Sequence, residues 1–160
     1  MKILILTAVA FFALTGKAKA DHIEDRNFLT TEFAKADAQT VYSQNDRINA
    51  LTPDQVTRFQ HVAHEQAQIW GDTILEGDYQ ADGQTTLDQV EELKIEGQLI
   101  AFKITYSERS WDTSICPSND ESHASLAQCE EGRIIESSFV SPDMGSWTRD
   151  PENFATFEAK

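Results

Sequence analysis

The first twenty residues constrain this chain more than any other segment, because they predict where it folds. Lys2 stands ahead of an apolar run from Ile3 to Leu14, and Ala18-Lys19-Ala20 follows. A basic start, a short apolar run and an A-x-A site are the three parts of a secretory signal peptide. We therefore expect residues 1–20 to be removed, and residues 21–160 to form one globular domain that is periplasmic or secreted.

The apolar run of this segment is too short to act as a membrane anchor. Crossing a bilayer takes about 20 apolar residues, whereas this run ends after Leu14. No second run of this kind follows along the chain. We therefore expect a soluble protein without membrane insertion.

The exported part is strongly acidic. The formal net charge is −14, and loss of residues 1–20, which carry three lysines and no acid, would change it to −17. Such a charge repels phosphate backbones and anionic lipids, so nucleic acid and membrane surfaces are unfavourable partners. Basic proteins, cationic ligands and divalent cations remain favourable. Acidity also keeps an exported protein soluble without any partner.

Two cysteines, Cys116 and Cys129, are the only ones in the chain. In an exported protein they predict one intramolecular disulfide. It would close a polar loop, residues 117–128, and a loop of that size gains roughly 3 kcal/mol in the chain-entropy description. A redox-active pair normally has C-x-x-C spacing, which is absent here.

One helix is well marked in the sequence. Thr52 fits the N-cap, Pro53 the first helical position, and Gln55 the third, as in a capping box. The apolar residues between Val56 and Trp70 then recur on one face at helical spacing. This pattern predicts an amphipathic helix whose apolar side, Trp70 included, packs into the core.

Glycines predict where this helix ends. Gly71 favours the left-handed conformation that closes helices, so an end near Trp70-Gly71 is expected. A continuation to Glu76 with Gly77 as the stop is the alternative. A weaker helical rhythm predicts a second, short helix near residues 31–43.

The rest of the chain has sequence patterns typical of β-strands and hairpin turns. Two dipeptides, Asp82-Gly83 and Glu96-Gly97, predict tight hairpin turns. Alternation from Ile100 to Tyr106 predicts a central strand. The fold class is therefore α+β, with one or two N-terminal helices followed by about five antiparallel strands, as a cystatin-like roll or a small β-barrel. The predicted strands cover residues 73–80, 90–95, 98–108, 132–140 and 153–158.

Residues 78–89 resemble the twelve-residue calcium loop of EF-hand proteins. Asp78, Gln80 and Asp82 would take positions one, three and five, and Gly83 the sharp turn at six. Position twelve is Gln89, which cannot supply the usual bidentate carboxylate. The same residues also fit a hairpin with an Asp-Gly tip, which we prefer. We therefore expect no cofactor, and a helix after Thr86 would instead favour calcium.

No catalytic motif is present. His61 and His64 stand three apart on the predicted helix, but without H-E-x-x-H spacing they are expected to be solvated. His123 falls in the loop between the cysteines. No serine lies in G-x-S-x-G or S-x-x-K. Carboxylates are numerous, and only two suitably placed ones are needed for a glycosidase.

Two tryptophans beside predicted loops, Trp111 and Trp147, are the candidate binding residues. Exposed tryptophans combine apolar area with an N–H donor and often anchor partners. Core packing is the alternative role for both. The sequence thus predicts a non-catalytic binding protein that recognises a protein partner or small ligand through strand-end loops, with inhibition of a basic secreted hydrolase such as lysozyme as one form. A small exported hydrolase with carboxylate or histidine chemistry and a calcium-binding protein are the alternatives.

Overall fold

The computed structural model describes residues 22–35, 37–74, 79–116, 126–145, 147–149 and 156–160. Within them lie two α-helices and a seven-stranded antiparallel sheet of order β2-β1-β3-β4-β5-β6, with β7 also paired to β5. The elements are α1 (His22–Ala34), β1 (Ala38–Ser43), β2 (Ile48–Asn49), α2 (Pro53–Ile74), β3 (Tyr79–Ile95), β4 (Gln98–Asp112), the 3-10 helices η1 (Thr113–Ile115) and η2 (Leu126–Gln128), β5 (Glu130–Val140), β6 (Trp147–Arg149) and β7 (Thr156–Ala159).

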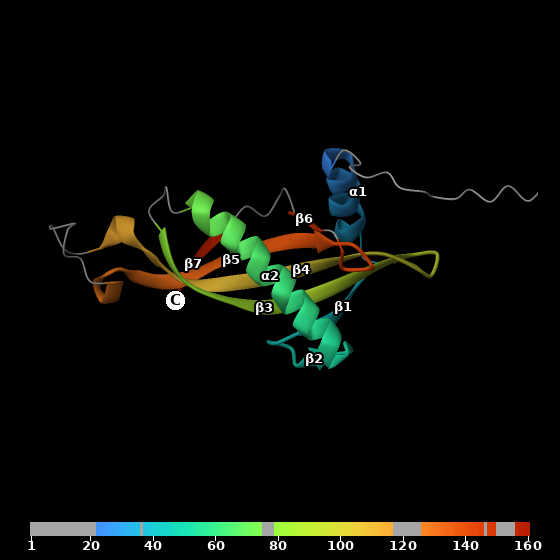
Figure 1. Ribbon diagram of the computed structural model, residues 1–160, viewed down its shortest axis with the longest axis horizontal. Coiled ribbons are helices and arrows are strands. Elements are labelled where there is room, and N and C mark those ends of the chain that lie inside the picture. The colour runs from blue at the N-terminus through green and yellow to red at the C-terminus, as the bar shows by residue number, and fades with distance from the viewer. Residues whose placement is uncertain (1–21, 36, 75–78, 117–125, 146, 150–155) are drawn as a thin grey trace, which may run out of the picture.

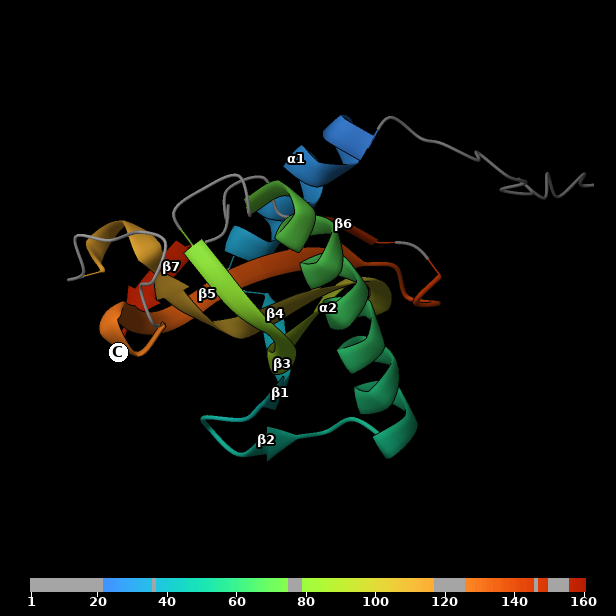
Figure 2. The ribbon, with the colours of Figure 1, turned by 60° about the vertical axis from the view of Figure 1, so that its left-hand side comes forward.

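The sheet is open and twisted, and α2 lies diagonally across one of its faces (Figure 1). Its described strands do not close into a barrel, because β2 pairs only with β1 and β6 only with β5. The predicted α+β class is therefore confirmed, whereas the small β-barrel is wrong. Figure 2 shows α2 as a separate layer beside the sheet. We call the side that α2 covers the α2 face, and the other side the second face.

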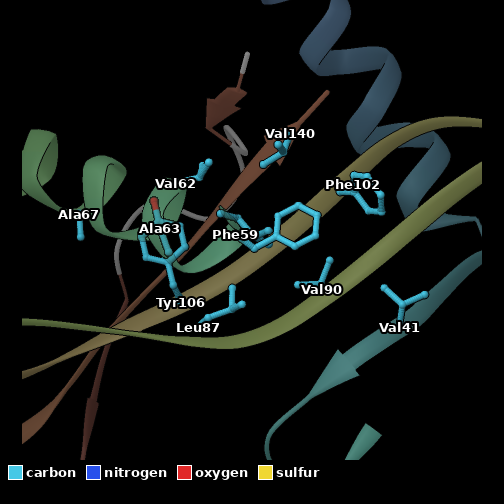
Figure 3. Close-up of a cluster of buried hydrophobic side chains, with 11 residues drawn as sticks. Val41, Phe59, Val62, Ala63, Ala67, Leu87, Val90, Phe102, Tyr106 and Val140 are labelled. Carbon is cyan, nitrogen blue, oxygen red and sulfur yellow. The ribbon is translucent and has the colours of Figure 1, made fainter. Parts of the chain in front are cut away.

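The core lies between α2 and the sheet. Apolar residues of α2 recur at helical spacing and are buried against alternating residues of β3 and β4, as Figure 3 shows. Phe59 meets Phe102 edge to face, with ring centroids 4.9 Å apart. The cluster consists of Val41, Phe59, Val62, Ala63, Ala67, Leu87, Val90, Phe102, Ile104, Tyr106 and Val140.

A polar clamp complements this packing. Gln60 of α2 donates from Nε2 to the carbonyl of Thr85 at 2.8 Å, and its Oε1 accepts from the backbone N–H of Leu87 at 3.0 Å. One side chain therefore satisfies a donor and an acceptor of β3, and fixes α2 along that strand.

The helix α1 packs on the second face. Successive residues of a strand point to opposite faces, so Phe139 of β5 points away from its core neighbour Val140. Phe33 of α1 stacks on Phe139, with ring centroids 5.3 Å apart. The two helices therefore cover opposite faces of the sheet.

Two local predictions are confirmed. The backbone N–H of Thr52 donates to Gln55 Oε1 at 2.9 Å, and the N–H of Gln55 donates to Thr52 Oγ1 at 3.3 Å, which is the expected capping box. Glu96 and Gly97 have φ values of 51° and 80° and join Ile95 to Gln98, as in a two-residue hairpin with both central residues left-handed. The strands 98–108 and 132–140 are also found, and β4 is central, between β3 and β5.

Two boundaries are wrong. The first α-helix ends at Ala34, and Ala38–Ser43 form β1, where β-branched and aromatic side chains pair with β3 in place of the helix predicted near 31–43. The second α-helix continues through Gly71 to Ile74, so the predicted strand 73–80 is helical at 73–74, and only Tyr79 and Gln80 of it belong to a strand, as the start of β3. The cost of one helical glycine, about 1 kcal/mol, is offset because α2 packs along β3. The alternative end at 76–77 lies outside the described residues.

The predicted Asp82-Gly83 hairpin is also wrong. The strand β3 continues past it, since Ala81 pairs with Ser110 and Thr85 with Glu108. Residues 82–84 therefore bulge opposite Arg109 alone. A bulge and a hairpin tip both use a residue with positive φ, here Gly83 at 74°. The condition for a calcium loop at 78–89 is not met either, because a strand and not a helix follows Thr86.

Among the residues described, no helix is both long and apolar enough to cross a bilayer.

Candidate functional site

The connection from β4 to β5 is crosslinked. Cys116, directly after η1, forms a disulfide with Cys129, directly before β5, which confirms the predicted pairing. Asp112 Oδ1 accepts from the N–H of Ser114 at 2.9 Å, and the N–H of Cys129 donates to the carbonyl of Leu126 at 3.1 Å. These bonds hold η1 and η2 beside the disulfide, and we call the two short helices with the disulfide the disulfide tip.

Apolar side chains are exposed on the disulfide tip. Ile115 is 51% and Leu126 is 37% exposed, and among the described residues only Phe28 and Ile48 are large apolar side chains exposed to a similar degree. Half of this set therefore lies within three residues of one disulfide. The surrounding sequence is acidic, because residues 112–131 contain five acids and neither lysine nor arginine.

Trp111, one of the candidate binding residues, lies near the end of β4 at the base of the tip. It is half-buried, and the guanidinium carbon of Arg109 lies 4.9 Å from its ring centroid. Such a cation–π contact stabilises the orientation of both groups. Trp111 is also opposite Glu131 in the β4–β5 pairing.

Glu131 is held in its ionised form. Its Oε1 accepts from Arg109 Nε at 2.8 Å and from Lys160 Nζ at 3.2 Å. These hydrogen bonds, first from Arg109 and then from Lys160, lower the pKa of Glu131. The carboxylate therefore stays charged and engaged, which suits recognition better than proton transfer at neutral pH.

Trp147 does not join this site. Its backbone pairs with Val140 at one end of β5, whereas Trp111 pairs with Glu131 near the other end. Nine residues of extended strand separate these two positions, or about 30 Å. The backbone positions of the two candidate tryptophans therefore lie near opposite ends of β5.

His61 and His64 each contact a different residue of α2. His61 Nε2 lies 3.2 Å from Glu65 Oε1, and His64 Nε2 lies 3.0 Å from Gln68 Nε2, both within α2. His123 lies outside the described residues. Over the described ranges, no group of three or more histidine, cysteine or acidic side chains is arranged to hold a metal ion.

Sequence reasoning missed one unusual acid, Glu108 of β4. It is half-buried on the α2 face, and loss of hydration raises its pKa. A hydrogen bond from Thr85 Oγ1 and the nearby His64 oppose this rise, whereas Asp82 adds to it. The alternation from Ile100 to Tyr106 would have placed Glu108 on this face, had it been extended by one step.

Comparison with protein families, curated proteins and solved structures finds no match to this chain.

Proposed function

We propose that this chain is an exported, non-catalytic binding protein that docks on a protein partner through the disulfide tip. The observation that carries the proposal is the exposure of Ile115 and Leu126 beside the Cys116–Cys129 disulfide. Exposed apolar side chains are common singly, whereas apolar side chains gathered on one surface mark interaction sites, and these two lie within three residues of one disulfide. A crosslinked segment also loses less conformational entropy when it binds.

Export is supported by two features. Residues 1–20 have the pattern of a secretory signal peptide. The Cys116–Cys129 disulfide suits the oxidising compartments outside the cytoplasm, where such bonds persist. The tip would then face its partner in the periplasm or outside the cell.

A basic protein is the partner that the local charge favours. The sequence around the apolar pair, residues 112–131, contains five acids, and the whole chain carries −14. Specific interfaces often have an apolar centre and a polar rim, and charge complementarity accelerates and orients association. A basic secreted hydrolase such as lysozyme fits this description. Lysozyme inhibition is therefore the specific form of the proposal.

Calorimetric titration of lysozyme into the exported, processed protein tests this function. At low ionic strength we expect a Kd of ~1 μM or tighter, weakening as salt is added, because screening reduces the attraction. Ile115→Ser and Leu126→Ser should each weaken binding about tenfold, as expected for residues central to an interface.

The matched control is Ile48→Ser in β2, since Ile48 is 37% exposed like Leu126 but lies in the β1–β2 hairpin. It should leave the affinity unchanged. Absence of binding at low salt would reject lysozyme as the partner. An equal loss in Ile48→Ser would reject the disulfide tip as the docking surface.

A small exported hydrolase is the second candidate, because Glu108 has a feature of a general acid. Its pKa is raised by burial on the α2 face, and His64 of α2 lies near it. Enzymes raise carboxyl pKa values in this way so that the acid holds a proton near neutral pH. Hydrolysis of chromogenic glycosides or esters, lost in Glu108→Gln and retained in Glu130→Gln, would support this candidate. Equal activity in both variants would reject it.

A further inference from the structure

The second face of the sheet carries a groove of about 540 Å3. Its volume lies within the range of small-ligand sites, roughly 300–1,000 Å3. Residues of β3, β4 and β5 that alternate with core residues line it, together with the β1–β2 turn and the last residues of the chain. The lining comprises Gln44, Asn45, Asp82, Gln84, Thr86, Asp88, Ser107, Arg109, Glu131, Gly132, Arg133, Glu158, Ala159 and Lys160.

Two arginines stand directly opposite each other in this groove. Arg109 of β4 and Arg133 of β5 are register partners. Like charges in such positions repel and destabilise a strand pair. Each arginine is therefore held by its own carboxylate: Arg109 by Glu131 at 2.8 Å, and Arg133 by Asp88 at 2.8 Å.

The guanidinium groups keep donors for a ligand. Each has five N–H donors. The hydrogen bonds between described residues use only Nε of Arg109, and only Nη2 of Arg133, which donates to Asp88 and to the hydroxyl of buried Ser107. The two side chains remain 54% and 47% exposed. Exposed guanidinium groups with unused N–H donors match the geometry of a carboxylate.

The remaining lining narrows the class of ligand. Asp82, Asp88, Glu131 and Glu158 accompany the cations Arg109, Arg133 and Lys160. A doubly charged phosphate would meet more repulsion from these acids than a carboxylate carrying a single charge.

The uncharged part of the lining favours hydroxyl groups. Gln44, Asn45, Gln84 and Thr86 offer amides and a hydroxyl, whereas the only apolar side chain in the lining is that of Ala159. An aliphatic tail would therefore find no apolar wall.

We infer that this groove binds a small hydroxylated carboxylate, such as a sugar acid. The carboxylate is held by Arg109 and Arg133, and the hydroxyls are held by the amide and hydroxyl side chains near the β1–β2 turn and the β3 bulge. This binding site goes beyond the proposed function, and it does not use Ile115 or Leu126.

Titration of the exported protein with glucuronate at low salt, followed by calorimetry or by amide shifts, tests the inference. We expect saturable binding with a Kd of about 1 mM or tighter. Glucose lacks the carboxylate and hexanoate lacks the hydroxyls, so each should bind at least about tenfold more weakly because hydrogen bonds are lost. Inorganic phosphate should also bind at least about tenfold more weakly, because the acids of the lining repel its second charge.

Arg133→Gln should weaken glucuronate binding about tenfold or more. Arg58→Gln makes the same charge change at an exposed position of α2 and should leave binding intact. If Arg133→Gln fails to fold by circular dichroism, Arg109→Gln provides the same test, since the side chain of Arg109 donates a hydrogen bond only to Glu131 among described residues.

Three results would overturn the inference. They are no saturable binding at millimolar glucuronate, tighter binding of phosphate than of glucuronate, and an equal loss in Arg58→Gln. Lysozyme binding is tested with Ile115→Ser and Leu126→Ser, and glucuronate binding with the arginine variants. A failure of the proposed function can therefore be distinguished from a failure of this inference.

Discussion

The same strands build two faces that are held together in different ways. On the α2 face, Tyr106 of β4 is 1% exposed within an apolar cluster. On the second face, Arg109 of the same strand is 54% exposed and paired with Glu131. Burial of apolar area stabilises by about 25 cal/mol per Å2, whereas an exposed ion pair contributes between 0 and about 1 kcal/mol. Stability therefore resides mainly on the α2 face.

Two acids make this difference explicit. Glu108 on the α2 face has a raised pKa because burial disfavours its charge. Glu131 on the second face has a lowered pKa because Arg109 and Lys160 donate to it. Burial on the α2 face therefore destabilises a charged side chain, whereas hydrogen bonds from cationic side chains on the second face stabilise one. Recognition of polar or charged partners is therefore expected on the second face and at the disulfide tip.

The largest effect should follow from Phe59→Ala. Phe59 is fully buried and meets Phe102 within the α2 core. Loss of a buried phenylalanine costs about 3–5 kcal/mol of unfolding free energy, measurable by urea denaturation. Arg58→Ala, at the exposed neighbouring position, should stay within about 0.5 kcal/mol. A cost below about 1 kcal/mol for Phe59→Ala would show that the α2 face is not the main source of stability.

An intermediate effect is expected where β7 extends the α2 face. A Cβ on Gly132 would lie 2.4 Å from the carbonyl oxygen of Glu158 and 2.4 Å from the ring of Phe157. Gly132→Ala should therefore displace β7 and cost about 1–3 kcal/mol, as overpacking does. Part of this cost should disappear in a Phe157→Ala background, measured as a double-mutant cycle. Identical costs in both backgrounds would show that the ring does not pack on Gly132.

Local signals predicted the local structures of this chain. The start of α2 depends on Thr52 and Gln55, three residues apart, and the Glu96-Gly97 turn depends on two adjacent residues, so both could be read directly. The disulfide followed from there being only two cysteines. The position of β1 could not be read, since Ala38–Ser43 becomes a strand only by pairing with β3 far along the chain.

The candidate sites depended still more on distant pairing. The Asp82-Gly83 sequence fits both a hairpin turn and a bulge. It forms a bulge because β3 pairs with β4 on both sides of it. The Arg109–Arg133 pair requires the register of β4 against β5, 24 positions apart in the sequence. Trp111 was identified for its residue type, but its partner Arg109 and the separation from Trp147 became visible only with that register.

The smallest effects are the changes in Tm caused by Glu108→Gln and by Glu131→Gln. The way these changes depend on pH is the most direct test of the difference between the two faces. The raised pKa of Glu108 means that the folded state holds its proton more tightly than the unfolded chain. The stability gained from that proton is complete below the unfolded pKa, about 4.3, and is lost as pH rises through the folded pKa. Glu108→Gln should therefore raise the Tm at neutral pH and change it little in acid.

Glu131 should behave in the opposite way. Its lowered pKa contributes stability that is present above the unfolded pKa and lost as pH falls through the folded pKa. Glu131→Gln should therefore lower the Tm at neutral pH, with the difference vanishing in acid, and exposed Glu130→Gln serves as the control for both. Thermal unfolding from acid to neutral pH measures the difference in Tm between each variant and the unsubstituted protein. If both had the same sign at neutral pH, the two faces would not treat charge differently, and the reason to place recognition on the second face would be lost.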